Sequence, residues 1–173
     1  MSKVGIAVTT YNNPDHIKLL INSCIKQTFH DFEVFIADDG STDDTVAIME
    51  KYAKRDNKIH IYPLEHGERG IARLVAIGEA IKNGVDYILI IDSDMCLKEN
   101  LLDEAMIFLK ERPEVDALVI KEIPYSKYTN YYSKVKVFER RLINNSGEAV
   151  DKNSIEAARF WRTEAYEDTG GIH

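Results

Sequence analysis

The chain has 173 residues, 45% of them hydrophobic, which is enough for one ordinary hydrophobic core and few for two. Its formal net charge of −7 and pI near 5.3 argue against a general nucleic-acid-binding protein, which would carry a basic surface. No apolar run approaches the roughly 18 residues that span a bilayer, and the first strand begins too early to leave room for a signal peptide. The two cysteines form no disulfide framework or zinc spacing, which favours a reducing cytoplasm.

Strand and helix patterns alternate along most of the chain. Short runs rich in β-branched and aromatic residues predict strands at 4–9, 32–37, 59–62, 87–91 and 117–120. Helical spacing predicts helices that start at Pro14 or Asp15, after Asp43, at Ile71 and at Asn100. In the third helix, one face carries Ile71, Leu74, Val75, Gly78 and Ile81.

This alternation predicts an α/β fold with a right-handed, mostly parallel central sheet and helices on both faces. The sequence contains no clear linker or internal repeat, so residues 1–173 are expected to form a single domain.

The pattern loosens after Pro124, where aromatic residues recur among lysines and serines. They are Tyr125, Tyr128, Tyr131, Tyr132 and Phe138. These side chains either line a groove for a sugar or lipid, or pack against the sheet. A local basic cluster consists of Lys134, Lys136, Arg140 and Arg141. It is either a solvated helix face or a contact surface for phosphates or an anionic membrane.

The apolar run Tyr87–Ile91 lacks alternation, as expected of a strand buried on both faces. Asp92, Ser93 and Asp94 follow it directly, at the sheet edge where ligands bind in open α/β folds. Carboxylates at this position offer the hard oxygen ligands that Mg²⁺ and Mn²⁺ prefer. Asp-Ser-Asp is also a common turn and helix cap, so these residues alone leave both interpretations open.

Two other predicted strands end in similar polar residues. The first ends at Thr9, Thr10 and Tyr11, and the second at Asp38 and Asp39. An aromatic ring can stack on a base, a carboxylate can accept a hydrogen bond from a base or ribose, and a metal can bridge a diphosphate. Neither a Gly-x-Gly-x-x-Gly nor a P-loop motif is present, which removes the strongest signals for a dinucleotide dehydrogenase or P-loop phosphotransferase.

These motifs, in this order and spacing, resemble the family 2 glycosyltransferases with the GT-A fold. The resemblance rests on four segments: Val4–Asn12, Gln27–Phe29, Phe32–Asp43 with its Asp-Asp-Gly-Ser-Thr-Asp motif, and Asp86–Asp94 with its Asp-x-Asp motif. It weakens after about Leu109 and returns at Ala158–Arg162 and Gly170-Gly171.

The resemblance implies a role for each matched residue. Thr9, Thr10 and Tyr11 would hold the base and ribose, and Asp39 would accept a hydrogen bond from the base ring with Asp38 beside it. Arg73 would lie near the diphosphate or near the metal-binding acids. Asp92 and Ser93 would border the ribose, and Asp94, with Asp92 through water, would hold Mn²⁺ or Mg²⁺. In the loop before Arg73, His66 belongs either to a solvated charged segment or to a mobile loop that touches the donor sugar.

The chain departs from the family where a catalytic carboxylate is expected. Inverting relatives commonly carry this general base beyond the Gly-Gly turn, and the sequence stops at His173. Asp168 precedes that turn and is a weak candidate, more typical of a helix surface, and a terminal His173 is more typical of disorder than of metal binding. The expectation is therefore a truncated chain, or one lacking a C-terminal acceptor or membrane region, with its base beyond His173.

Together these features predict a metal-dependent inverting glycosyltransferase. It would transfer a sugar from a nucleotide-sugar, with UDP as the expected nucleotide, to a glycan or lipid-linked acceptor. Its location would be the cytoplasm or the inner face of the membrane, without a nucleic-acid partner. Two alternatives remain: a non-catalytic nucleotide-binding domain, favoured by the missing base, and a sugar nucleotidyltransferase, which would need a basic glycine-rich loop after the first strand.

Overall fold

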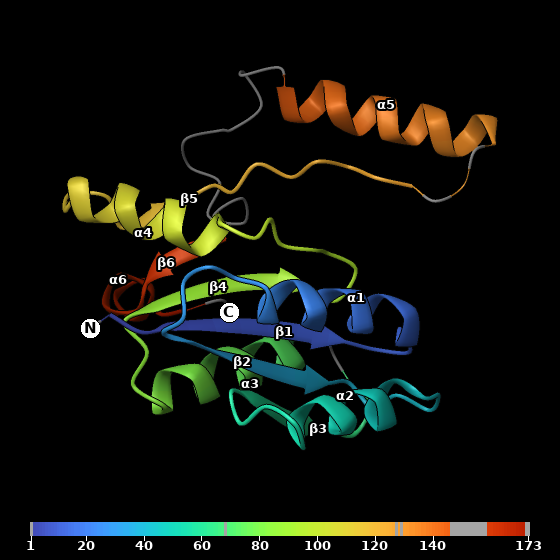
Figure 1. The fold of residues 1–173 in the computed structure, drawn as a ribbon, viewed down its shortest axis with the longest axis horizontal. Helices are drawn as coiled ribbons and strands as arrows, with labels where there is room; N and C mark the ends of the chain where they lie inside the picture. Colours follow the sequence, from blue (N-terminus) through green and yellow to red (C-terminus); the bar gives the residue numbers. More distant parts are fainter. Residues whose placement is uncertain (1, 68, 127, 129, 146–158, 172–173) are drawn as a thin grey trace. The chain divides into compact units, whose positions relative to one another are not determined.

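A computed structural model of the chain describes residues 2–67, 69–126, 128, 130–145 and 159–171 (Figure 1). The chain divides into two compact units: unit 1 comprises Met1–Leu118 and Arg159–His173, and unit 2 comprises Val119–Ala158. The elements of unit 1 are β1 (Val4–Thr10), α1 (Pro14–Ile25), β2 (Phe32–Asp38), α2 (Thr45–Ala53), β3 (Ile59–Pro63), α3 (Arg69–Lys82), β4 (Tyr87–Asp92), α4 (Leu101–Glu111), β5 (Ala117–Leu118), β6 (Phe160–Arg162) and α6 (Thr163–Asp168). Unit 2 contains α5 (Tyr131–Asn145).

The described strands of unit 1 form one six-stranded sheet in the order β3-β2-β1-β4-β6-β5. β1 pairs in parallel with β2 and β4, and β3 pairs in parallel with β2. β6 runs antiparallel to its neighbours β4 and β5. The prediction of a mostly parallel α/β sheet is therefore confirmed, and the carboxyl ends of β1 to β4 lie at the same edge.

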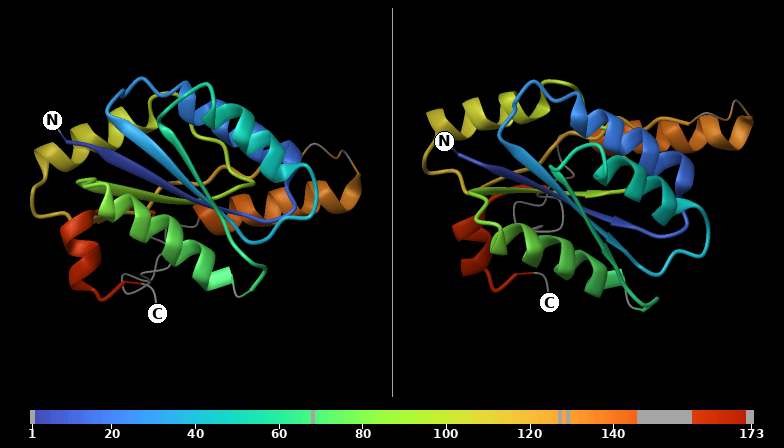
Figure 2. Two further views of the ribbon diagram at one scale, coloured as in Figure 1. Left: turned by 90° about the horizontal axis from the view of Figure 1, so that it is seen from below. Right: turned by 60° about the horizontal axis from the view of Figure 1, so that its bottom comes forward.

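Helices cover both faces of this sheet: α1, α2 and α4 lie on one face, and α3 and α6 on the other (Figure 2). Ile88, Leu89, Ile90 and Ile91 of β4 are therefore all buried, which explains why the run does not alternate. Gln27, buried just after α1, ties α1 to α4, because its Nε2 donates to the Ser23 carbonyl at 3.2 Å and its Oε1 accepts from the Leu102 N–H at 3.2 Å.

The two cysteines of the chain are free thiols. Cys24 lies in the buried face of α1, where burial raises the pKa of its thiol to about 12. It therefore stays protonated and packs as a small apolar side chain. Cys96 is exposed in the loop after β4.

The buried face of α3 differs from the one that its large apolar residues indicate. Ile71 and Leu74 are 54% and 47% exposed, whereas the helix buries its small residues and one isoleucine. The buried positions are Ala72, Ala76, Ile77 and Ala80. α3 lies so close to β1 that a Cβ on Gly5 would be 3.0 Å from the Cβ of Ala80. Close helix–sheet contact selects small side chains, which the spacing of large apolar residues does not reveal.

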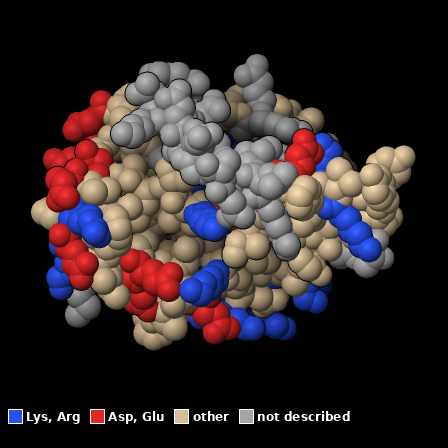
Figure 3. Space-filling view, turned by 90° about the horizontal axis from the view of Figure 1, so that it is seen from above, with Lys and Arg blue, Asp and Glu red and all other residues tan. Residues whose placement is uncertain are grey.

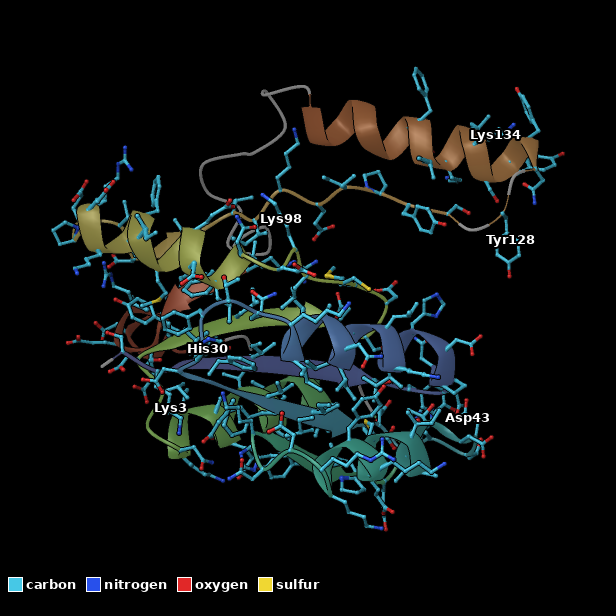
Figure 4. All side chains as sticks on the ribbon, viewed as in Figure 1. Lys3, His30, Asp43, Lys98, Tyr128 and Lys134 are labelled. Atoms are coloured by element: carbon cyan, nitrogen blue, oxygen red, sulfur yellow. The ribbon has the colours of Figure 1, made fainter. Side chains whose placement is uncertain are left out.

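Most large apolar side chains among the described residues of unit 2 are exposed. The exposed set comprises Val119, Ile123, Tyr125, Tyr128, Tyr131, Tyr132, Val135 and Phe138. α5 itself was not predicted, although its apolar residues lie at helical spacing, because its many charged and polar residues lower its mean hydropathy. Tyr128 and Lys134 are labelled near its start in Figure 4. The side chains of Arg140 and Arg141 lie outside the described residues.

Charged side chains of both signs are interspersed on the face shown in Figure 3, rather than collected in one basic surface. This distribution agrees with the formal net charge of −7. Within the described part of the chain, no helix has the length and hydropathy needed to cross a membrane.

We expect Gly5→Ala to lower the free energy of unfolding by about 1–3 kcal/mol, because the added methyl group overpacks the contact between β1 and α3. Gly78→Ala is the matched control, since a Cβ there meets nothing within 4 Å and the residue lies inside α3. This control should raise stability by about 0.5–1 kcal/mol through helix propensity. Urea denaturation measures both, and equal effects would contradict the close packing.

Candidate functional site

The strand register brings the predicted polar residues to one edge of the sheet. Thr9 is paired with Ala37 of β2 and Asp92 of β4, and Thr10 is paired with Asp38. The segments that follow these strands therefore start side by side. We call their polar residues the strand-end group: Thr9, Thr10, Tyr11, Asp38, Asp39, Asp92, Ser93 and Asp94. Figure 4 labels Asp43 at this end of the strands and Lys3 and His30 at the opposite end.

Asp38 organises the turn after β2. It is 1% exposed, and its carboxylate accepts hydrogen bonds from the Ser41 backbone N–H at 2.8 Å and the Ser41 hydroxyl at 2.5 Å. Gly40 completes the turn with a φ of +73°, which glycine adopts without strain. The Asp38 carboxylate thus stabilises the turn after β2, in which Asp39 lies.

Two asparagines that sequence analysis did not single out connect the loops of the site. The Asn13 amide nitrogen donates to the Ser93 hydroxyl at 3.0 Å, and Ser93 N–H donates to the Thr9 carbonyl at 3.2 Å. Asn12, at a φ of +45°, accepts from the Thr42 N–H at 2.8 Å. Only their place between a strand and a helix-starting proline could have marked them in the sequence.

Thr9 and Thr10 face different surroundings. Thr9 is partly exposed, whereas Thr10 is buried and its hydroxyl has no hydrogen-bond partner among the described residues. The Thr10 carbonyl accepts from the Asp39 N–H at 2.9 Å. The first two loops are therefore joined at the point where Asp39 begins.

Asp92 lies between two arginines. Arg73 Nη2 is 2.7 Å from its Oδ1, and Arg159 Nη1 is 3.4 Å from its Oδ2. Arg73 comes from α3, as the resemblance implied, whereas sequence analysis assigned no role to Arg159. Arg159 is 67 positions away and precedes β6, whose pairing with β4 brings it here, so no local spacing could have revealed it.

Asp94 differs from Asp92 because it is exposed and makes no hydrogen bond or ion pair with any other described residue. Its carboxylate suits Mg²⁺ or Mn²⁺. Asp92 is already balanced by two guanidinium groups, so Asp94 is the better direct ligand. The described residues contain no cluster of three side chains that could hold a metal alone, and a bound ion would need oxygens from phosphate and water.

Tyr11 and Asp39 are both in contact with His66. The rings of Tyr11 and His66 stack, with centroids 4.4 Å apart and planes 17° from parallel. His66 Nδ1 lies 2.9 Å from the Asp39 carbonyl oxygen and 3.1 Å from its Oδ2. Gly67 N–H donates to the other carboxylate oxygen of Asp39 at 3.0 Å. No local pattern in the sequence indicated this contact, because the loop of His66 is irregular.

Asp168, the weak candidate for a general base, lies elsewhere. α6 begins beside the start of β4, since Thr163 N–H donates to the Asp86 carbonyl at 2.9 Å. β4 has six residues, which separates its two ends by roughly 17–20 Å. Asp168 is exposed, in a hollow with Asp116 and Arg162, so this geometry gives it no support as a base for the strand-end group. His173 lies outside the described residues.

Comparison with known proteins gives matches over most of the chain. A family model described as Glycosyl transferase family 2 matches residues 5–169. A curated relative is TarS, the poly(ribitol-phosphate) β-N-acetylglucosaminyltransferase of Staphylococcus aureus strain Mu50, which is 34% identical over 153 residues. That match covers 83% of this chain and 26% of the relative. The putative teichuronic acid biosynthesis glycosyltransferase TuaG of Bacillus subtilis is 33% identical over 63% of this chain and 42% of its own.

Solved structures are similar as well. S. aureus TarS 1-349 in complex with UDP-GlcNAc has a TM-score of 0.71 at 29% identity, covering 97% of this chain and 47% of that one. The mannosyltransferase PcManGT from Pyrobaculum calidifontis, in complex with GDP-Man and Mn²⁺, has a TM-score of 0.67 at 20% identity. It covers 99% of this chain and 47% of that one, and it shows the fold alone. The chain thus spans a quarter to a half of these proteins.

We expect Gly40→Ala to disturb the contact between the Asp39 turn and the His66 loop. A Cβ on Gly40 would lie 2.5 Å from the His66 backbone nitrogen, and the positive φ adds strain. Gly84→Ala is the control, with a φ of +70° and nothing within 4 Å. Gly84→Ala should cost about 1–2 kcal/mol of stability. Gly40→Ala should cost about 1–3 kcal/mol more through the collision, and equal losses in chemical denaturation would contradict it.

Proposed function

Because the chain belongs to glycosyl transferase family 2, whose model matches residues 5–169, we propose that it forms the donor-binding part of a glycosyltransferase with the GT-A fold. Its donor is a nucleoside-diphosphate sugar. The observation that carries this proposal is the strand register, which gathers an aromatic ring, acids and an arginine-balanced carboxylate at one sheet edge. A UDP-sugar is the proposed donor, because TarS, at 29% identity, binds UDP-GlcNAc.

The base and ribose bind, in this proposal, to the loops after β1 and β2. Tyr11 is 44% exposed and offers its ring for stacking. The Asp39 carboxylate accepts a hydrogen bond from a ring N–H of the base. Asp38 holds the turn of Asp39, and Ser93 holds the loop after β4 through Asn13. Thr9 and Thr10 border the ribose.

The diphosphate binds at the carboxyl end of β4. Asp94 ligates a Mn²⁺ or Mg²⁺ ion, which would neutralise charge on the leaving nucleoside diphosphate. Arg73 and Arg159 add two positive charges at this place. Their ion pairs with the Asp92 carboxylate keep the two guanidinium groups oriented. Departure of the diphosphate builds negative charge, and these groups stabilise it as it forms.

The reaction is, in this proposal, a single displacement that inverts the anomeric centre. An acceptor hydroxyl of a glycan or lipid carrier attacks the anomeric carbon and loses its proton to a base, while the bond from that carbon to the diphosphate breaks. The carboxylates of the strand-end group are all engaged: Asp38 and Asp39 accept internal hydrogen bonds, Asp92 is balanced by arginines, and Asp94 is the proposed metal ligand. We therefore assign no general base.

The proposed location is the cytoplasm, at the inner face of the membrane if the acceptor is lipid-linked. Two free thiols support a reducing compartment. The exposed aromatic side chains and lysines around α5 offer contacts for a glycan or for anionic lipid headgroups.

A second candidate is a non-catalytic nucleotide-binding domain. It is favoured by one observation: three of the four carboxylates in the strand-end group, those of Asp38, Asp39 and Asp92, are already held by internal partners. Binding of UDP without transfer from UDP-GlcNAc to any glycan or lipid-linked acceptor would support it over the enzyme.

Titration calorimetry tests the metal ligand. UDP should bind in the presence of Mn²⁺, and Asp94→Asn should weaken this binding about tenfold or more, because a charged ligand of the ion is lost. Asp31→Asn, which makes the same change before β2 at the opposite end of the sheet, should leave it unchanged. If chelating the metal does not affect UDP binding by the wild type, the proposed metal site is wrong.

Arg73 provides a separate test of the diphosphate position. Arg73→Ala should weaken UDP binding about tenfold, the value of one charge-assisted hydrogen bond, and leave binding of uridine unchanged. Arg55→Ala, in the turn after α2, is the control and should affect neither. Equal losses for UDP and uridine would show that Arg73 acts on the loop structure rather than on phosphate.

A further inference from the structure

His66 contacts both residues that are proposed to recognise the base. Its imidazole ring stacks on Tyr11 at 4.4 Å, and its Nδ1 lies 3.1 Å from the carboxylate of Asp39. One side chain thus makes the ring contact and the polar contact together. The 17° angle between the two planes is that of a stacked pair rather than a chance edge contact.

The chemistry of the imidazole matches that of a nucleobase in this position. Nδ1 faces two acceptors, the carbonyl oxygen and Oδ2 of Asp39, so it carries the hydrogen and donates it. A uracil ring offers the same two features, a flat π surface and a ring N–H. His66 therefore presents to Tyr11 and Asp39 what a base would present.

The Asp39 carboxylate is largely covered in this arrangement. Its side chain is 9% exposed, Oδ2 faces His66, and Oδ1 accepts from Gly67 N–H at 3.0 Å. A base that stacked on this face of Tyr11 and bonded to Asp39 Oδ2 would occupy the place of the His66 ring. We propose that His66 is an internal occupant of the base subsite, and that a nucleoside diphosphate displaces it on binding. The inference rests on the proposed donor site.

The segment that carries His66 is suited to this movement. Glu65, His66 and Gly67 are exposed, and His66 itself is 57% exposed at its side chain. Just before them in the chain, Leu64 N–H donates a hydrogen bond to the Asp38 carbonyl at 2.9 Å. A Cβ on Gly67 or Gly70 would meet little or nothing within 4 Å, so the segment has space on that side. Apart from the approach of the His66 backbone to Gly40 and the bonds to Asp39, the exposed segment has few contacts, which lowers the cost of moving the His66 ring.

Displacement makes the apparent affinity depend on the internal contact. When the binding-competent state is a fraction of the population, the apparent Kd rises by the inverse of that fraction. Removing the imidazole should therefore tighten nucleotide binding, by about threefold to tenfold for one stacked, hydrogen-bonded ring on an exposed loop. A residue that helped to bind the base would have the opposite effect when removed.

The experiment compares UDP affinity in the wild type and two alanine variants by titration calorimetry with Mn²⁺. His66→Ala should bind UDP about threefold to tenfold more tightly. His60→Ala is the matched control, because His60 also pairs with a carboxylate, Glu33 at 3.1 Å, and stacks on an aromatic ring, Phe35 at 5.0 Å, near the start of β3. Its affinity for UDP should equal that of the wild type.

A spectroscopic measurement follows the displacement directly. With ¹³C-labelled histidine rings, the His66 signal, assigned by its loss in His66→Ala, should shift on addition of UDP as the ring leaves Tyr11. The His60 signal should stay in place.

The outcomes separate the two proposals. Tighter UDP binding by His66→Ala, together with the shift of the His66 signal, supports displacement. Equal or weaker binding by His66→Ala overturns displacement and leaves the donor site standing. If neither the wild type nor His66→Ala binds UDP, both the donor site and the displacement fail.

Discussion

The parallel pairing of β1 with β2 and β4 is the constraint on which the site depends. Parallel strands in register end at the same edge, so Thr10 is set beside Asp38 and Thr9 beside Asp92 by backbone hydrogen bonds alone. A shift of one residue in either pairing would turn the side chains of that strand to the opposite face. Specific packing on the faces of the sheet resists such a shift, because Gly5 of β1, for example, leaves room for the close approach of Ala80 of α3. The sheet thus positions the polar loops, and the Thr9 and Thr10 carbonyls at its edge bind the backbone N–H groups of Ser93 and Asp39.

Internal donors balance most of the acids at this edge. Ser41 donates hydrogen bonds to Asp38, Gly67 and His66 contact the carboxylate of Asp39, and two arginines face Asp92. Balanced carboxylates cost less to gather, since like charges at close range repel. Asp94 is exposed and without such a partner among the described residues, which is why it is the proposed ligand of a cation. These hydrogen bonds and ion pairs therefore also decide which acid is open to a ligand.

Local sequence was informative wherever chemistry and periodicity coincide. The run before Asp92, the Asp-Asp-Gly-Ser-Thr-Asp turn and the helix starting at Pro14 each follow from neighbouring residues. The buried face of α3 was not predictable in this way, because Ala80 is selected by the nearness of Gly5, 75 positions earlier in the chain. α5 was missed for a different reason, since its charged and polar residues lower its mean hydropathy and conceal the helical spacing of its apolar residues.

The sequence by itself determined the α/β class, the edge at which the acids gather and the family to which their motifs point. Strands, turns and the spacing of short motifs are written over a few consecutive residues, so they can be read locally. Only the tertiary structure decided that Arg159 faces Asp92 and that His66 covers Tyr11 and Asp39. It also decided that α6, which carries Asp168, begins at the opposite end of β4. The positions of Arg159 and α6 depend on the antiparallel pairing of β6 with β4, and the contacts of His66 depend on the path of the irregular loop that carries it. Neither feature produces a periodic pattern in the sequence.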